Sequence, residues 1–420
     1  MASRAVRGFK DILPADSMKW NLVEETARDV FWSAGLREIR TPVLEKTEVF
    51  ARGIGEHTDI VEKEMYTFAD RNGDSLTLRP EATAGILRAV IENKLYAATP
   101  FLKLFTMGPM FRHERPQKGR LRQFHQINVE YLGSSAPCAD AEVIWLAWEI
   151  LNNLTTGNLK LELNTLGCPK CRPAHRADLD RYLKGVMPAL CDDCRRRSHS
   201  NPLRVFDCKN GECRKQLLQA PLVKHYMCIE CAEHLGAMMD ALESMDVPFV
   251  QNPWLVRGLD YYTRTAFEIV SSDLGAQSTV AAGGRYDSLV KELGGPDMPG
   301  VGMAIGVERV LLLLDEPEAD RGIDLFVAAL GRDAREEALQ WVKELRVSGI
   351  SVEISFEDKS LKAQMKQADR SGASHTIIIG ENELEEEEVV LRNMKTREQV
   401  RVAFDEVVEH MEKIFTEGEM

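Results

Sequence analysis

The sequence lacks any long apolar run. Residues 1–20 contain basic side chains but no continuous apolar stretch after them, and no run of about 18 apolar residues occurs anywhere. These absences argue against an export signal and a membrane-spanning helix. We therefore expect a cytoplasmic protein that has no membrane partner.

An excess of positive charge is also absent. The net charge is -13 and the pI is about 5.4, which taken alone argues against a nucleic-acid binder. The charge is unevenly distributed, however. Residues 168–227 contain 13 Lys and Arg against 6 Asp and Glu, whereas residues 321–420 contain 14 against 22. The net charge of the whole chain is therefore a poor guide to its partners.

Length and composition indicate a globular protein with more than one domain. A chain of 420 residues exceeds a typical single domain, so at least two domains are expected. With 44% hydrophobic and 28% charged residues, the composition excludes a disordered, collagenous or fibrous chain.

Cysteines are concentrated in one segment. Eight of the nine lie between residues 168 and 231, and Cys138 is the exception. They form four close pairs: Cys168/Cys171, Cys191/Cys194, Cys208/Cys213 and Cys228/Cys231. In a reducing compartment such pairs bind metal more often than they form disulfides. Because the segment is also basic, we interpret it as an insertion.

Hydrophobic periodicity predicts a chain that mixes helices and strands. Helices are expected at residues 17–34, 81–95, 139–157 and from 302 to 314. Strands are expected at residues 37–46, in a hairpin over 64–80 that turns at Asn72-Gly73, at 101–116 and 121–133 around a basic loop, and at 159–167, 264–272 and 278–287. Residues 315–322 are a predicted linker, strands and helices alternate beyond it, and the acidic run 381–388 is a predicted solvated loop.

Three groups of residues suggest chemistry. The first is a loop with five cations, followed by polar residues that alternate along a strand: Arg112, Arg115, Lys118, Arg120 and Arg122, then Gln126, Asn128 and Glu130. The second is Arg257, Asp260, Tyr261 and Tyr262 between an apolar segment and a strand. The third combines the glycines of AAGGRYDSLV with Glu308-Arg309 in an expected apolar helix. Taken singly, they also fit a solvated basic hairpin, a structural Arg/Asp pair and an ordinary core helix.

Taken together, these segments resemble the histidyl-tRNA synthetases, a family of class II aminoacyl-tRNA synthetases, over nearly the whole chain. TPVLEKTEVFARGIGEHTDIV (residues 41–61) is similar to the dimer-forming first class II motif. FRHERP with RQFHQINVE is similar to the second motif, and GVGMAIGVERV to the third. LVRGLDYY (255–262) and AAGGRYD (281–287) are similar to the two signatures of the histidine enzymes, and the first of them is the most specific.

The resemblance implies an α/β (α+β) fold and a homodimer. It implies a split catalytic domain with an antiparallel sheet and helices at residues 1–166 and 250–318. A cysteine-rich insertion at 167–249 and an α/β anticodon-binding domain at 323–420 complete the implied organisation. The implied reaction joins L-histidine to tRNA(His) through an adenylate made from ATP.

Site residues follow from the matching motifs. The implied histidine site comprises Glu81, Ala82, Thr83 and Gln126 near the α-amino group, Glu130 and Tyr262 on the two imidazole nitrogens, and Tyr261, Arg112 and Arg257. The implied ATP site comprises Arg112 on the α-phosphate, Phe124 under adenine and Arg309 on the γ-phosphate, with Mg²⁺ on the β and γ phosphates. No protein nucleophile is needed, so Arg257, with help from Arg112, is the expected catalytic group.

Contacts with tRNA are implied in two regions of the chain. Arg115, Gln117 and Lys118 of the second motif are expected at the acceptor end. A small basic patch that includes Lys359, Lys362 and Lys366 is expected to contact anticodon bases, despite the acidity of this region.

The cysteine pairs depart from the family pattern, because many members lack them. Their spacing suggests one four-thiolate zinc site at Cys168, Cys171, Cys191 and Cys194, and a second at Cys208, Cys213, Cys228 and Cys231. Reduced thiols, an iron–sulfur cluster and disulfides are the alternatives. Any such site is expected to be structural, so that chelation would change stability or tRNA affinity before adenylate formation.

Two other functions compete with this interpretation. A regulatory relative of the enzyme, a subunit of ATP phosphoribosyltransferase, binds histidine without activating it, but lacks an anticodon-binding domain and parts of the signatures. A zinc-dependent RNA-binding protein would leave the catalytic motifs unexplained. Synthetases for proline, threonine or glycine would not carry LVRGLDYY together with AAGGRYD.

Overall fold

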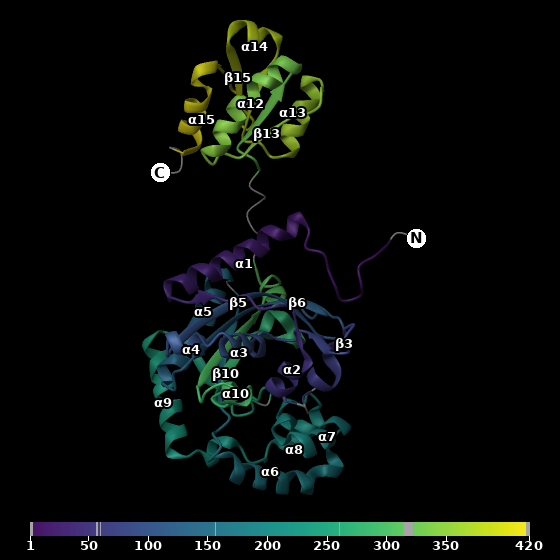
Figure 1. Cartoon of the computed structure of the whole chain (residues 1–420), viewed down its shortest axis with the longest axis vertical. Helices are drawn as coiled ribbons and strands as arrows, with labels where there is room; N and C mark the ends of the chain where they lie inside the picture. Colours follow the sequence, from purple (N-terminus) through teal and green to yellow (C-terminus); the bar gives the residue numbers. More distant parts are fainter. Residues whose placement is uncertain are drawn as a thin grey trace. The chain divides into compact units, whose positions relative to one another are not determined.

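Alternating apolar residues build an eight-stranded sheet in the first of two units, which comprise residues 1–315 and 316–420 (Figure 1). This computed structural model describes residues 3–55, 58, 60–155, 157–259, 261–314 and 322–416. The predicted linker at 315–322 lies outside the described residues except for Gly322, and Asp260 lies outside them too. No helix among the described residues has the length and apolarity to span a membrane.

The large sheet has the strand order β1-β5-β6-β11-β10-β9-β7-β8. Its strands are β1 (Arg37–Glu38), β5 (Leu102–Phe111), β6 (Gln123–Leu132), β7 (Leu159–Thr165), β8 (Phe249–Gln251), β9 (Thr263–Ser271), β10 (Thr279–Arg285) and β11 (Gly300–Gly306). The pairs β1/β5 and β7/β8 at its edges are parallel, and the pairs between them are antiparallel. The predicted antiparallel sheet is therefore confirmed.

The first unit contains a second, three-stranded sheet. Its strands are β2 (Leu44–Lys46), β3 (Tyr66–Ala69) and β4 (Ser75–Leu78), in the order β2-β4-β3. The hairpin β3/β4 turns at the expected place, and Gly73 adopts a φ of 90° there. This left-handed conformation suits glycine, which has no Cβ atom.

Helices of the first unit pack on and around the sheets. They are α1 (Pro14–Ser33), α2 (Thr47–Ile54), α3 (Thr83–Glu92), α4 (Leu95–Ala98), α5 (Pro137–Leu154), α6 (Arg172–Val186), α7 (Asp192–Ser200), α8 (Gly211–Leu217), α9 (Ile229–Ser244), α10 (Leu289–Glu292) and α11 (Val307–Val310). The cysteine-rich segment between β7 and β8 is thus helical, and the boundaries 167 and 249 stay predictions for this insertion.

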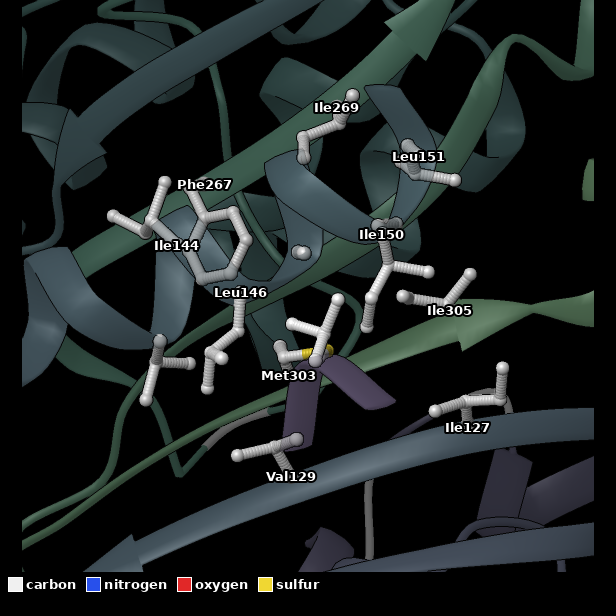
Figure 2. Packing of buried hydrophobic residues seen from close by; sticks show 14 of the residues in the cluster. Ile127, Val129, Ile144, Leu146, Ile150, Leu151, Phe267, Ile269, Met303 and Ile305 are labelled. Atoms are coloured by element: carbon white, nitrogen blue, oxygen red, sulfur yellow. The ribbon is translucent and has the colours of Figure 1, made fainter. Parts of the chain in front are cut away.

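One face of the large sheet is covered by α1, α5 and α9, which bury a continuous apolar core. In Figure 2, Ile144 and Ile150 of α5 lie with Phe267 of β9 and with Met303 and Ile305 of β11 in this core. Because side chains alternate along a strand, the odd-numbered residues 127–131 of β6 enter this core and its even-numbered residues face the opposite side. The candidate site occupies that opposite side.

One predicted helix is wrong. Residues 300–306 form strand β11, and the helix that follows spans only Val307–Val310. The run GVGMAIG has period two: Val301, Met303 and Ile305 enter the core. Gly302 is required between them, because a Cβ atom there would lie 2.0 Å from Oε2 of Glu130. The Glu308-Arg309 pair therefore belongs to a single turn after a strand.

The second unit is a five-stranded sheet with the order β13-β12-β14-β15-β16. Its elements are β12 (Leu325–Ala329), α12 (Arg332–Val347), β13 (Val352–Ile354), α13 (Leu361–Arg370), β14 (His375–Ile379), α14 (Glu381–Glu386), β15 (Glu388–Asn393), β16 (Gln399–Ala403) and α15 (Val407–Thr416). The expected alternation of strands and helices holds through β14.

Two details of this unit differ from the expectation. The acidic run at 381–388 forms helix α14 and enters β15 instead of a loop, and the Glu383 side chain accepts from the Gly380 N–H at 2.9 Å at the helix start. The segment after it is a hairpin of β15 and β16, which alternation alone did not predict. Asn393 closes the turn, because its side-chain oxygen accepts from the N–H groups of Lys395 and Thr396.

A buried ion pair joins the helices to the sheet. Asp140 of α5 and Arg285 of β10 both have fully buried side chains, and Arg285 Nε donates to Asp140 Oδ1 at 3.0 Å. The same carboxylate bonds Nε2 of His234 in α9 at 2.8 Å and accepts from the Thr265 hydroxyl of β9 at 2.5 Å. Burial opposes the ionised form, but the bonds from His234 and Arg285 outweigh it and lower the pKa of Asp140. Four elements therefore meet at one carboxylate.

Replacing Asp140 should destabilise the first unit strongly. The Asp140→Asn variant leaves the buried Arg285 charge with only the partly exposed Asp287 as a counter-ion. We expect it to lose about 3–5 kcal/mol of unfolding free energy at pH 7 in urea denaturation. Because the folded pKa of Asp140 is lowered, its contribution is present above its unfolded pKa and disappears as pH falls through the folded value. The difference between wild type and variant should therefore shrink in acid.

Asp287→Asn is the matched control. Asp287 also accepts from Arg285, at 2.9 Å, but its side chain is 32% exposed. We expect a loss of less than about 1 kcal/mol for this variant. Equal losses for the two variants would contradict the central role of Asp140.

Candidate active site and cysteine centres

Strands β5 and β6 carry the basic loop of the second motif. The strands pair antiparallel over their whole length, and the Arg112 N–H donates to the Arg122 carbonyl at 2.9 Å at the mouth of the loop. The predicted tRNA residues Arg115, Gln117 and Lys118 are exposed on this loop. The two strands therefore fix both ends of the loop and leave its tip in solvent.

A cavity of about 270 Å³ lies beneath the loop. It brings together five residues that the sequence analysis assigned to ATP or histidine: Arg112, Phe124, Gln126, Arg257 and Arg309. The cavity is also lined by residues to which the sequence analysis gave no role in binding ATP or histidine. These are Glu114, Arg120, Glu268, Thr279 and Glu308, with several small residues of β10 and β11. Four arginines around one cavity suit a ligand with several negative charges.

Backbone carbonyl groups hold Arg112 and Arg309 at the cavity. Arg112 donates from Nε to the Pro80 carbonyl at 2.8 Å, and its guanidinium lies 5.2 Å from the Phe124 ring centroid. Arg309 donates from Nε to the Gly119 carbonyl at 3.2 Å. Burial lowers the pKa of both arginines, and the positive charge of Arg120 adds to this effect at Arg309. An anionic ligand would relieve both penalties.

Arg257 is paired with Glu268 of β9. The pKa of Arg257 is raised, because the Glu268 carboxylate outweighs the burial of the guanidinium. The second oxygen of Glu268 accepts from the Thr279 hydroxyl at 2.9 Å, and Arg257 Nε is buried without a partner among the described residues. Sequence reasoning missed Glu268, although a single carboxylate in the apolar strand TAFEIV was a usable signal.

The residues that are predicted to bind the ligand histidine lie on the face of the large sheet that carries α3. Glu81 caps this helix: its oxygens accept from the N–H groups of Thr83 and Ala84 at 2.7 and 2.9 Å. Ala82 is 1% exposed beside it. The Thr83 hydroxyl donates to Glu130 of β6 at 2.6 Å. Glu81, Ala82, Thr83 and Glu130 are therefore brought together, as expected.

Three tyrosines surround the same carboxylates. The Tyr261 and Tyr262 ring centroids lie 4.6 Å apart, and Tyr261 lies 5.6 Å from Tyr286. The Tyr286 hydroxyl donates to the second oxygen of Glu130. Tyr286 received no role in the sequence analysis, although it lies in the quoted signature AAGGRYD. The structure makes it a direct partner of the predicted imidazole acceptor.

Glu130 has an unusual environment for a carboxylate. It is 1% exposed, and burial raises its pKa to about 8 in spite of the hydroxyl donors, with Glu81 contributing in the same direction. Gln126, four residues earlier on the same face, has a side-chain oxygen without a partner among the described residues. This unsatisfied acceptor suits a ligand that brings N–H donors.

The cysteines form two sets, and the predicted pairing was wrong. Cys168, Cys171, Cys228 and Cys231 form one set, called here the outer set, and Cys191, Cys194, Cys208 and Cys213 form the inner set. In each set the ligand atoms lie within 4.8 Å of one another. Spacing suggested that consecutive pairs combine, but the fold returns the last pair to the first. The four close pairs themselves were correctly identified.

The sulfur separations fit a tetrahedral metal site. Cys168 Sγ lies 3.6 Å from Cys171 Sγ and 3.9 Å from Cys228 Sγ, and Cys171 Sγ lies 3.7 Å from Cys231 Sγ. In the inner set, Cys191 Sγ lies 3.8 Å from Cys208 Sγ. A tetrahedron with zinc–sulfur bonds of ~2.3 Å has edges of about 3.8 Å. Disulfides require sulfurs about 2.0 Å apart, so all eight thiols are free.

Known proteins resemble the chain over nearly all its length. The family profile described as histidyl-tRNA synthetase matches residues 8–170 and 205–310, and the profile of an anticodon binding domain matches 324–414. A histidine–tRNA ligase of Desulfotalea psychrophila is 52% identical over 404 residues, which cover 95% of this chain and 93% of that protein. The apo histidyl-tRNA synthetase of S. aureus has a TM-score of 0.83 at 35% identity, and the match covers 98% and 100% of the two chains.

The comparison also bears on the regulatory alternative. A Bacillus halodurans structure, described as an ATP phosphoribosyltransferase regulatory subunit/histidyl-tRNA synthetase, has a TM-score of 0.65 at 20% identity and covers 87% of this chain and 97% of its own, which shows a shared fold only. The anticodon-binding match of residues 324–414 is the domain that the regulatory relative was expected to lack. The chain belongs to the histidyl-tRNA synthetase family.

Proposed function

We propose that the chain is an aminoacyl-tRNA ligase that attaches L-histidine to tRNA(His). The observation that carries the proposal is the cavity that is lined by four arginines and by Gln126 of β6, the strand that also carries the buried Glu130, in a member of this family. A pocket of carboxylates and tyrosines suits the ammonium and imidazole groups of histidine. The arginines suit a triphosphate.

Activation needs two anions to meet. The histidine carboxylate attacks the α-phosphorus of ATP, and pyrophosphate leaves. A terminal ribose hydroxyl of the tRNA then attacks the carbonyl carbon of the adenylate, and AMP leaves. Neither step uses a protein nucleophile, so catalysis comes from positioning and from stabilising charge at the phosphate. We assign the latter role to Arg257, assisted by Arg112, since both line the cavity.

Histidine is held by groups that match its donors. We assign its α-ammonium to Glu81, Thr83 and Gln126, and its ring to Glu130 and Tyr262. Ala82 and Tyr261 complete the wall. The ionised Glu130 accepts from a ring N–H, and Thr83 and Tyr286 hold its two oxygens in place. A side chain without N–H groups would leave these acceptors unpaired, which provides discrimination.

ATP is assigned to the arginine cavity. Phe124 lies under the adenine, Arg112 contacts the α-phosphate and Arg309 the γ-phosphate. Mg²⁺ prefers phosphate and water oxygens with one or two carboxylates. Glu114, Glu268 and Glu308 line the cavity, so the residue types fit a phosphate-bound Mg²⁺. When bound, this ion neutralises charge on the β and γ phosphates.

tRNA is assigned to two surfaces. We assign the acceptor end to Arg115, Gln117 and Lys118, which are exposed on the loop above the cavity. In the second unit, Lys362 and Lys366 are exposed four residues apart on α13, and the exposed Lys359 pairs with Glu357. We assign this patch to the anticodon.

We further infer that the protein works in the cytoplasm as a homodimer and that its cysteine sets hold structural Zn²⁺. The segment 41–61 that resembles the dimer motif exposes Val43 and Leu44, and Phe68 of the same small sheet is 47% exposed. Apolar side chains in such a patch favour a protein interface. For zinc, the support is the tetrahedral spacing of the sulfurs in both sets.

ATP–pyrophosphate exchange tests the function directly. Exchange measured with each of the twenty amino acids should require histidine, and purified tRNA(His) should then accept the activated histidine. Exchange with proline but not histidine, or with no amino acid at all, would overturn the assignment.

Arg257→Ala should slow adenylate formation by about 10²–10³-fold, because a preorganised cation at the α-phosphate is lost. Histidine affinity, measured by calorimetry, should fall by less than about tenfold, since one contact to the carboxylate is lost. Arg257→Lys should give an intermediate rate, because it keeps the charge but loses the planar fork. An unchanged exchange rate in Arg257→Ala would remove its catalytic role.

Histidine affinity should rise with pH in a manner that depends on Glu130. Because its pKa is raised to about 8, Glu130 in the free enzyme is mostly protonated below this pH and ionised above it. Histidine should therefore bind more tightly at pH 8.5 than at pH 7 in calorimetric titrations. Glu130→Gln should lose this difference and retain only the titration of the ligand. The same pH dependence in both proteins would refute the role of Glu130.

A further inference from the structure

The outer cysteine set lies where the helical insertion leaves the large sheet and where it returns. Cys168 follows β7 by three residues, and Cys171 directly precedes α6. Cys228 and Cys231 lie at the start of α9, which leads back to β8. In both pairs the N–H of the second cysteine donates to the carbonyl of the first, at 2.9 and 3.1 Å. The two turns thus present two sulfurs each to a common point.

The turn with Cys168 and Cys171 adjoins β9, the strand that follows the tyrosines predicted to bind histidine. The Arg264 N–H donates to the Gly167 carbonyl at 2.9 Å, and the Leu166 N–H donates to the Arg264 carbonyl at 2.6 Å. Gly167 has a φ of 67°, and a Cβ atom there would lie 3.0 Å from Cys171 Cβ. Only glycine therefore fits easily between the strand pair and the cysteine turn.

Arg172 connects this turn to Tyr262. It follows Cys171 directly, donates from Nε to the Leu166 carbonyl at 3.0 Å, and donates from Nη2 to the backbone carbonyl of Tyr262. Arg172 and Tyr262 also line one cavity of about 470 Å³. Because this space lies beside the tyrosine segment, packing alone does not fix the segment there. The guanidinium provides a polar restraint at this side.

The turn with Cys228 and Cys231 is connected through α9 to the buried carboxylate of Asp140. His234 lies one helical turn after Cys231 in α9 and bonds Asp140 at 2.8 Å. Asp140 also holds Arg285, the residue before Tyr286. A metal bound to all four cysteines would therefore connect the anchored start of α9 to the start of α6, which carries Arg172.

We propose that the outer cysteine set is a metal centre that positions Tyr262 for histidine, through Cys171 and Arg172. The proposal rests on the proposed function, in which Tyr262 contacts the imidazole ring. Without metal, four thiols make only weak S–H contacts. The start of α6 would then be tied to α9 across this point by weak contacts, and Arg172 would lose the fixed position from which it restrains Tyr262. Loss of this metal should weaken histidine binding, whereas the sequence alone suggested effects on stability or tRNA first.

The inner set is a comparison within the same chain, because its surroundings differ from those of the outer set. The Cys191 N–H donates to Cys213 Sγ at 3.1 Å, and the Asn210 N–H donates to Cys208 Sγ at 3.4 Å. Outside the insertion, Cys191 and Cys208 line a cavity together with Arg112 and Arg120. It offers the same four thiolates and the same spacing, but it does not adjoin Arg172. Metal loss there should act on the side of the arginines and leave the contact between Arg172 and Tyr262 in place.

The experiment compares three variants of the full-length chain by metal content and exchange kinetics. Zinc per chain is measured by mass spectrometry of protein purified under reducing conditions, and KM for histidine and kcat are measured by ATP–pyrophosphate exchange. The variants are Cys228→Ser/Cys231→Ser in the outer set, Cys208→Ser/Cys213→Ser in the inner set, and Arg172→Met. The outer double variant leaves Cys171 and Arg172 themselves unchanged.

Wild type should contain two zinc ions per chain. The outer variant should contain one and raise the histidine KM by about tenfold, the scale of one lost hydrogen bond, with kcat within about twofold. The inner variant should also contain one, and it should raise the KM for histidine less than the outer variant does, because it keeps the contact between Arg172 and Tyr262. Arg172→Met should keep two zinc ions and raise KM as the outer variant does. Combining Arg172→Met with Cys228→Ser/Cys231→Ser should raise KM no further.

Each failure has a distinct signature. Wild type without zinc, or with an iron–sulfur chromophore instead, would overturn the metal assignment while leaving histidine-dependent exchange intact. Two zinc ions with an unchanged KM in Arg172→Met would overturn the positioning role. This variant keeps both cysteine sets, so the role is tested even if the cysteine variants fail to fold. Absence of histidine-dependent exchange in wild type would instead refute the proposed function.

Discussion

The buried carboxylate of Asp140 is the interaction on which the first unit depends most. A charge in an apolar core costs several kcal/mol unless it is paired and hydrogen-bonded. Here it is satisfied by Arg285, His234 and Thr265, which come from a strand, a helix and a second strand. Because each partner is needed, the carboxylate fixes the positions of three elements at once. Arg285 in turn places Tyr286, its neighbour in sequence, against Glu130.

Gly302 determines how closely the Glu130 side chain can lie against the sheet. Strands β6 and β11 pair so that Gly302 lies opposite Glu130, and the carboxylate occupies the space where a Cβ atom would be. The Glu130 side chain is thereby laid against the sheet, within reach of Thr83 from α3 and of Tyr286 from β10. Three motifs that are distant in sequence therefore meet at Glu130. One supplies the small residue Gly302, and the other two supply the hydroxyl donors Thr83 and Tyr286.

The sequence predicted much of this site, and the misses have physical causes. Alternation along β6 correctly separated Gln126 and Glu130 from the core residues Ile127 and Val129. The expected helix at 302 was wrong because glycines dilute the apolar signal of a strand. In the second unit, the β15/β16 hairpin was missed because its turn depends on the Asn393 side chain rather than on a glycine.

Other misses came from contacts between distant residues. Asp140, Glu268 and Tyr286 act through partners on other elements, which no local pattern reveals. Cysteine spacing identified the close pairs but not their combination, since the fold brings residues 168 and 228 together across 60 positions. Long-range pairing of this kind depends on topology, and the helical path of the insertion was not predicted.

The charge of the cavity also explains how an acidic protein handles a polyanion. Arg112 and Arg120 each lower the pKa of Arg309, and burial lowers the pKa of all three. The free enzyme therefore holds cations in a state that is unfavourable without a counter-ion. In the proposed function, a triphosphate would remove this penalty when it binds, so that part of its binding energy would already be present in the folded chain. Arg257 differs, because Glu268 neutralises it beforehand. In the proposed reaction, this charged and already oriented group would respond to the extra negative charge of the transition state at little cost of reorganisation.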